Sequence, residues 1–158
     1  MASRLTNGSD NRVFISYSHA DRKWLDRLLD HLAPLVREGA ILVWADTSIR
    51  VGADWKREIR SALDSAWVAV LLVSHHFLAS DFIMDEEIPR LLAAAESKGT
   101  TIMPVIVGPS LFSETPSLAR FQAVNPPSKP LSAMKASERE ETLVRLAREI
   151  RRLISEDH

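Results

Sequence analysis

The chain has 158 residues, a length that fits one domain able to bury its own hydrophobic core. Its formal net charge of −1 gives no overall electrostatic reason to bind nucleic acid or an anionic membrane surface. The sequence contains no cysteine, which excludes disulfides, cysteine zinc sites, thiol nucleophiles and iron–sulfur clusters.

The missing cysteines, the N-terminal residues and the apolar runs are all compatible with a cytoplasmic location, which we therefore expect. Residues 1–11 are short and polar, and they lack the apolar core of a signal peptide. The longest apolar run, residues 66–73, is far too short to span a bilayer. We therefore expect a flexible N-terminal segment (1–11), one folded domain (12–155), and neither a membrane nor nucleic acid as a partner.

Short apolar runs alternate with amphipathic patterns along the domain. The predicted strands are 13–17, 41–44, 66–73 and 101–107, with a weaker fifth candidate at 121–124. The predicted helices run from 24 towards 39, from 55 to 63, from 86 to 98, and from 137 to 153. Pro104 argues against a central position for its strand, because proline cannot donate to a strand ladder.

Strands separated by helices predict an α/β fold with a parallel sheet and helices on both of its faces. Such sheets bind ligands at the carboxyl ends of their strands, near the point where the strand order reverses. This rule selects three loops as candidate binding segments, namely 18–21, 45–54 and 74–85.

Several common kinds of site are missing from the sequence. None of the five glycines forms a G-x-G-x-x-G turn or a phosphate-binding P-loop, which disfavours dehydrogenases and NTPases of the usual design. No G-x-S-x-G elbow is present, so a hydrolase triad of that type is also disfavoured. His75 and His76 are adjacent and do not normally face one point, so we expect no metal.

Four segments, taken in order, resemble the TIR (Toll/interleukin-1 receptor) domain family. The first is 14–19, Phe-Ile-Ser-Tyr-Ser-His, which resembles the opening strand and its loop. The second, 44–59, resembles the second strand and the BB loop that follows it. The third, 71–89, resembles the segment that carries the catalytic glutamate of the family. The fourth, 101–131, resembles the back half of bacterial TIR domains.

The resemblance implies both a fold and an activity. The family fold is flavodoxin-like, a three-layer αβα arrangement with a five-stranded parallel sheet in the order 2-1-3-4-5. Many bacterial members cleave the ribose–nicotinamide bond of NAD+ to give ADP-ribose or a cyclic form of it, and this implies a role in prokaryotic immune or antiphage signalling. NAD+ is then the substrate, with no added cofactor, and other TIR domains are partners by self-association.

Carried over by motif, the catalytic residue is Glu87, which precedes Ile88 and Pro89. Glu86 is also acidic, and the spacing from Phe82 leaves both glutamates open as the catalytic one. A structural interpretation also stays open, because acidic residues at the start of a helix are favoured by the helix dipole alone.

The resemblance places further residues against the substrate. Tyr17, Ser18 and His19 occupy the loop that contacts nucleotide in the family, although Tyr17 also fits a packed residue that ends a strand. Asp46 and Arg50 belong to the BB loop, where an arginine contacts substrate, binds a neighbouring subunit or is simply solvated. Ser74 ends the third strand, where it faces the ribose or begins a turn.

Two other functions stay as alternatives to NAD+ cleavage. The first is a non-catalytic module that recruits other TIR domains. The second is a receiver-like phosphorylation domain, which is disfavoured because the first strand is not followed by an acidic pair and Asp46 stands alone.

Overall fold

The computed structural model describes residues 11–45 and 53–156, which form a parallel sheet between two layers of helices. The strands are β1 (Arg12–Ser16), β2 (Leu42–Trp44), β3 (Val68–Val73) and β4 (Thr101–Ile106). The longer helices are α2 (Arg22–Arg37), α3 (Ala53–Ser65), α5 (Ile88–Lys98) and α7 (Ala136–Glu156). The short helical elements are η2 (His19–Asp21), α4 (His75–Ala79), η3 (Ile83–Glu87), η4 (Phe112–Glu114), α6 (Pro116–Ala119) and η5 (Leu131–Ala133).

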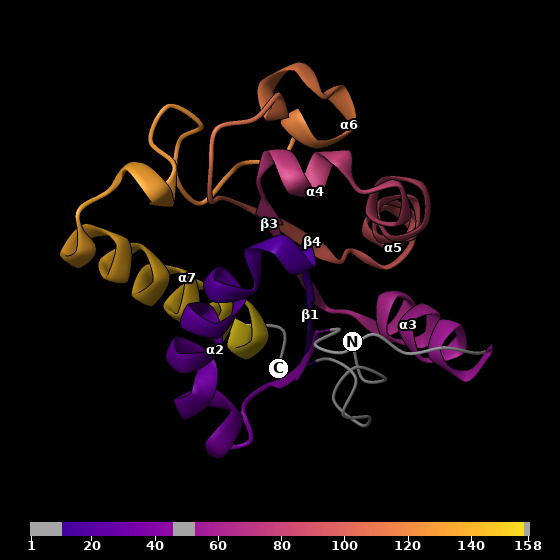
Figure 1. Cartoon of the computed structure of the whole chain (residues 1–158). Coiled ribbons are helices and arrows are strands. Elements are labelled where there is room, and N and C mark those ends of the chain that lie inside the picture. Colours follow the sequence, from indigo (N-terminus) through magenta and orange to yellow (C-terminus); the bar gives the residue numbers. More distant parts are fainter. Residues whose placement is uncertain (1–10, 46–52, 157–158) are drawn as a thin grey trace.

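The described strands are all parallel and follow the order β2-β1-β3-β4, as predicted for the first four. All six residues of β3 are buried, which fits a strand covered on both faces. Helices α2 and α7 pack on one face of the sheet, and α3, α4 and α5 pack on the other (Figure 1). The three-layer αβα prediction is therefore confirmed.

The prediction of a fifth strand at 121–124 is wrong for the described residues, in which the sheet has four strands. The segment does run beside β4, and the Val124 N–H donates to the Pro104 carbonyl over 2.8 Å. Beyond this bond, the side chain of Asn125 takes the place of the backbone hydrogen bonds that a fifth strand would make. The Asn125 amide accepts from the Ile106 N–H (3.0 Å) and donates to the Ile106 carbonyl (2.9 Å), so backbone pairing stops after one bond.

Pro104 lies in the edge strand β4 at a position where a missing N–H costs no hydrogen bond to β3. The Thr101 N–H donates to the Trp67 carbonyl and the Val107 N–H to the Val73 carbonyl, so the odd-numbered amides of this segment face β3. The even position of Pro104 faces outward, where its missing N–H removes no bond to β3. As expected from Pro104, β4 is not central but lies at the edge of the described sheet.

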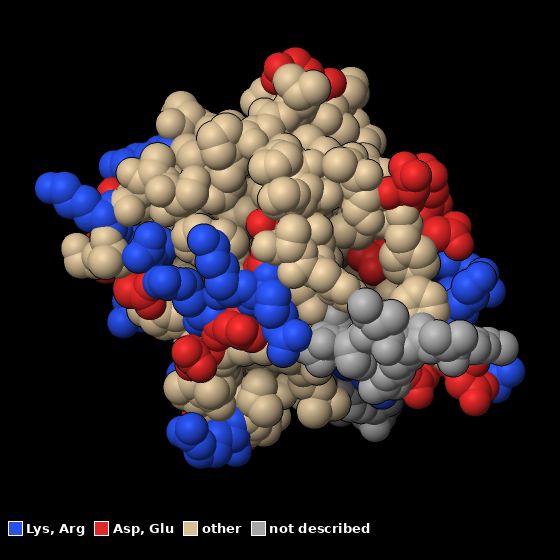
Figure 2. Space-filling view, in the orientation of Figure 1, with Lys and Arg blue, Asp and Glu red and all other residues tan. Residues whose placement is uncertain are grey.

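Helix ends also follow the sequence. Gly39 lies just beyond α2, and Gly99 follows α5 at once; both adopt a φ of 79°, the left-handed conformation that glycine allows at a helix end. In the described chain, no helix is both long enough and apolar enough to cross a membrane. On the face shown in Figure 2, Lys and Arg gather over α2 and α7, whereas the surface over α4 and α6 is mostly uncharged.

Candidate active site

A pocket of about 300 Å³ opens at the carboxyl ends of β1 and β2, on the side of the sheet that α3 and α5 cover. Its described lining combines aromatic side chains, small hydroxyl groups and one carboxylate. The lining residues are Phe14, Ile15, Tyr17, Ser18, His19, Trp44, Trp55, Ser80, Phe82, Ile83 and Glu87. This position agrees with the rule that open α/β sheets bind ligands beyond the carboxyl ends of their strands.

Glu87 is the carboxylate of this pocket, and it is only 6% exposed. Its Oε1 accepts a 2.6 Å hydrogen bond from the hydroxyl of Ser16, the last residue of β1. Ser16 is itself 1% exposed. A short bond between two buried groups fixes the carboxylate against the end of the strand, with its side chain in the pocket wall.

The local backbone explains why Glu87 faces inward. Residues Ile83–Glu87 form a π-helical turn, in which the Ile88 N–H donates to the Ile83 carbonyl five residues earlier. Ser80 precedes this helical segment and caps it, because its Oγ accepts from the Ile83 N–H over 3.2 Å. The wider turn lets both Glu87 and the next residue, Ile88, point inward, the first into the pocket and the second into the core. Such turns inside helices are frequent at functional sites.

Glu86 takes a different direction from Glu87. Its side chain is exposed, and it lies beside Lys56 and Arg60 of α3 and Arg90 of α5. Since one glutamate lines the pocket and the other lies on the outer surface between two helices, the geometry separates two residues that the sequence left open. The helix predicted from 86 starts earlier in the structure, because residues 81–82 are already helical and the π-helical turn leads from them into α5 without a break.

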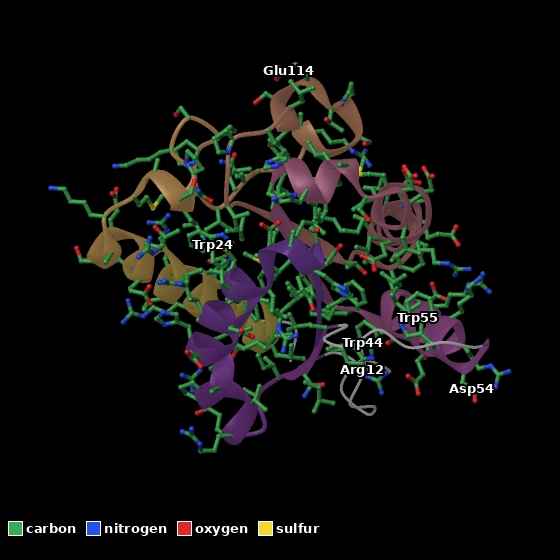
Figure 3. All side chains as sticks on the ribbon, in the orientation of Figure 1. Arg12, Trp24, Trp44, Asp54, Trp55 and Glu114 are labelled. Atoms are coloured by element: carbon green, nitrogen blue, oxygen red, sulfur yellow. The ribbon has the colours of Figure 1, made fainter. Side chains whose placement is uncertain are left out.

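Aromatic rings form the other walls. The Trp55 and Phe82 rings lie 5.3 Å apart, and the Phe14 and Trp44 rings stack at 5.2 Å with an interplanar angle of 8°. In Figure 3, Trp44 and Trp55 both lie on the α3 side of the sheet, away from Trp24 on the α2 side. Flat apolar walls near a carboxylate suit a ligand that has both aromatic rings and polar groups.

The residues predicted in the first loop are brought together in the pocket. Tyr17, Ser18 and His19 all line it, and the Tyr17 and His19 rings lie 5.6 Å apart. Tyr17 is 6% exposed, so it is packed as well as pocket-lining. Ser18 caps the turn that follows, because its Oγ accepts from the Ala20 N–H at 3.3 Å.

Of the three remaining predicted residues, the structure describes only Ser74. Asp46 and Arg50 lie outside the described residues. Ser74 is 3% exposed and begins α4, where its Oγ accepts from the Phe77 N–H and donates to a carboxylate oxygen of Asp21. Both bonds occupy the Ser74 hydroxyl, and the described pocket lining does not include this residue.

Known proteins resemble this chain in sequence and in fold. The model of the TIR domain family matches residues 13–144. The chain belongs to the TIR domain family. The uncharacterized protein y4lF of Sinorhizobium fredii is 34% identical over 120 residues, which are 76% of this chain and 37% of that protein. The chain thus spans little more than a third of the length of this curated relative.

A solved structure shares the fold of this TIR domain. It is the crystal structure of the RPS4 and RRS1 TIR domain heterodimer, with a TM-score of 0.53 and 18% sequence identity. The match covers 88% of this chain and 96% of the other. At this level of identity the likeness shows the fold alone.

Sequence patterns did not identify several residues that line or support the TIR pocket. Ser16 lies in a predicted strand and supports the pocket through Glu87, whereas Trp44 and Trp55 line the pocket and flank the loop 45–54, selected as a binding segment. Asp21 was only the end of another such loop. Within the described residues, no group of three or more His, Asp or Glu side chains could hold a metal ion.

Proposed function

We propose that this TIR domain cleaves NAD+ at the bond between ribose and nicotinamide. Nicotinamide leaves, and the ribose bonds either to water, which gives ADP-ribose, or to a group of the same molecule, which gives a cyclic ADP-ribose. The observation that carries the proposal is the buried carboxylate of Glu87, held by Ser16 in an aromatic-lined pocket at the carboxyl edge of the sheet. TIR domains include NAD+-cleaving enzymes, and the family membership supports the same chemistry here.

The chemistry of the bond explains the need for a carboxylate. Nicotinamide leaves as a neutral molecule, so its departure requires no proton. Positive charge develops on the ribose as the bond breaks, as it does in glycoside cleavage. A fixed anion beside that ribose stabilises the transition state more than the ground state, and this difference accelerates the reaction.

The parts of the pocket then take distinct roles. Glu87 faces the ribose and stabilises its developing charge. Ser16 holds one oxygen of that carboxylate, so the charge needs little reorientation during the reaction. The rings of Trp55 and Phe82 offer flat surfaces for the nicotinamide, since stacking on aromatic side chains is a common way to bind planar bases.

The pocket is large enough for only the nicotinamide end of the substrate. A volume of about 300 Å³ is at the lower limit of ligand pockets, which suits the nicotinamide and its ribose rather than the whole dinucleotide. The diphosphate and adenosine then extend outward past Ser18 and His19. Asp46 and Arg50 stay as proposed contacts from the loop after β2.

Nicotinamide release tests the proposal directly. Purified wild-type protein is incubated with NAD+ over a wide range of protein concentrations, and the products are separated and identified by mass. We expect nicotinamide and one form of ADP-ribose in equal amounts, with turnover per molecule rising with concentration. The absence of both products at every concentration would reject cleavage.

A second candidate is a non-catalytic module that assembles with other TIR domains. It is favoured by the solved structure that shares this fold, which is described as a heterodimer of two TIR domains. Concentration-dependent association without nicotinamide release would favour this candidate. For the catalytic function we propose a role in prokaryotic immune or antiphage signalling, which NAD+ depletion in bacterial cells that express the protein would test.

A further inference from the structure

Two buried hydrogen bonds tie the chain after β1 to the chain after β3, and they run in opposite directions. Ser16 ends β1 and donates to Glu87, which follows β3 and α4. Ser74 follows β3 directly and donates to Asp21, which closes the turn after β1. All four residues are at most 6% exposed. Each segment thus contributes one serine and one carboxylate.

These two bonds lie at the point where the segments that follow β1 and β3 diverge to opposite faces of the sheet. Strands β1 and β3 are neighbours, but α2 turns to one face of the sheet while α4 and α5 turn to the other. The chain therefore opens a crevice at this edge, which is where such sheets bind their ligands. A bond across the crevice fixes the distance between its two sides.

The Asp21 side chain bonds to Ser74 instead of capping its own helix. Asp21 precedes α2 in the N-cap position, where an aspartate usually accepts a hydrogen bond from the first turn of its own helix. Here its side chain makes no such bond and contacts Ser74 instead, 53 positions away in the sequence. Ser74 is fixed in turn by the Phe77 N–H at 3.1 Å.

The position of Asp21 sets the position of one side of the pocket. The Asp21 N–H donates to the Ser18 carbonyl at 2.8 Å, and the Ala20 N–H donates to the Ser18 hydroxyl. Ser18 and His19, which line the pocket, belong to this tight turn. A displacement of Asp21 therefore moves both residues relative to the fixed Glu87.

We propose that Asp21 and Ser74 are positioning residues, whose hydrogen bond holds the turn 17–20 where it binds the outer part of the substrate. The inference rests on the proposed cleavage of NAD+ and assigns a role to two residues that do not line the pocket. Because Ser16 and Glu87 make a separate bond, loss of the Asp21–Ser74 bond weakens substrate binding and leaves the chemical step nearly intact.

Kinetics on the full chain test this inference with Ser74→Ala and Asp21→Ala, and with Asp21→Asn as the milder variant if the alanine fails to fold. We expect KM for NAD+ to rise on the order of 10-fold, the scale of one buried charge-assisted hydrogen bond, with kcat within about 2-fold of wild type. Ser74→Thr keeps the hydroxyl and should restore KM. An unchanged KM in the folded variants would overturn the proposal.

Hydrogen exchange separates this proposal from the proposed function. The backbone amides of residues 17–22 should exchange on the order of 10-fold faster in Ser74→Ala than in wild type, while those of α7 keep their rate. If the wild type never cleaves NAD+ but exchange rises only in this turn, cleavage is rejected and the hydrogen bond keeps its positioning role. Unchanged exchange in the turn would reject that role, whatever the activity.

Discussion

Removing the Ser16 hydroxyl should lower the turnover of NAD+, although the Glu87 carboxylate stays in the pocket. Ser16→Ala deletes the donor of a 2.6 Å bond to Glu87 and replaces none of the residues that line the pocket. A hydrogen bond to a charged group contributes about 1.5–3 kcal/mol, and its loss leaves the Glu87 carboxylate less constrained. If that energy serves mainly to aim the carboxylate in the transition state, kcat falls by roughly 10- to 150-fold.

The assay measures initial rates of nicotinamide release at saturating NAD+, together with the free energy of unfolding in urea. Ser16→Thr keeps a hydroxyl on a β-branched side chain suited to a strand, so it serves as the matched control and should retain most of the activity. A folded Ser16→Ala protein with kcat within about 2-fold of wild type would refute the orienting role of the bond.

Three more predictions address the pocket wall, the sheet edge and the last helix. Trp55→Ala should raise KM for NAD+ by roughly 5- to 150-fold, since stacking of a base on an aromatic ring contributes about 1–3 kcal/mol. Asn125→Ala should lower the free energy of unfolding in urea by about 2–3 kcal/mol, because the buried N–H and carbonyl of Ile106 lose their partner. The pKa of Glu140 is lowered by its hydrogen bond from His31, so Glu140→Gln should cost a few tenths of a kcal/mol near pH 7. That difference should vanish as the pH falls below 4.5, because a carboxylate with a lowered pKa stabilises the fold only while it is ionised.

Each of these variants has a control. Trp55→Phe keeps an aromatic face and should bind NAD+ better than Trp55→Ala; equal KM values would remove stacking from the account. Gln122→Ala, the control for Asn125→Ala, changes an exposed amide near the same edge of the sheet and should leave the free energy of unfolding unchanged. Glu141→Gln, the control for Glu140→Gln, changes an exposed carboxylate of α7 and should also leave it unchanged. A Glu140→Gln effect that persists at pH 3 would show that ionisation is not its cause.

The sequence predicted the layers of the fold well because burial leaves strong patterns. The continuous apolar run ending at Val73 indicated a strand covered on both faces, and the outward position of Pro104 agrees with its edge strand. The fifth strand was misjudged because its short apolar run resembles a strand, while Asn125, a single side chain, takes over the bonds that a ladder would make. Hydrophobic periodicity in the sequence cannot predict that a side chain will take the place of backbone hydrogen bonds.

The candidate site was predictable only in part. The family motif predicted Glu87 and left Glu86 open, and a π-helical turn, which adds one residue to the helix, decides which of the two lines the pocket. Hydrophobic periodicity assumes a regular helix and cannot register that added residue. Ser16 and Asp21 escaped notice because each is bonded to a residue more than fifty positions away.

Glu87→Gln compared with Glu86→Gln tests the central claim most directly. Both variants remove one negative charge, but only Glu87 lines the pocket, whereas Glu86 is exposed. Nicotinamide release is measured at a protein concentration where the wild type is fully active. We predict a loss of roughly 100-fold or more for Glu87→Gln, the scale of removing one preorganised electrostatic partner, and a near-wild-type rate for Glu86→Gln. A Glu87→Gln protein that cleaves NAD+ as fast as the wild type would contradict the proposed mechanism.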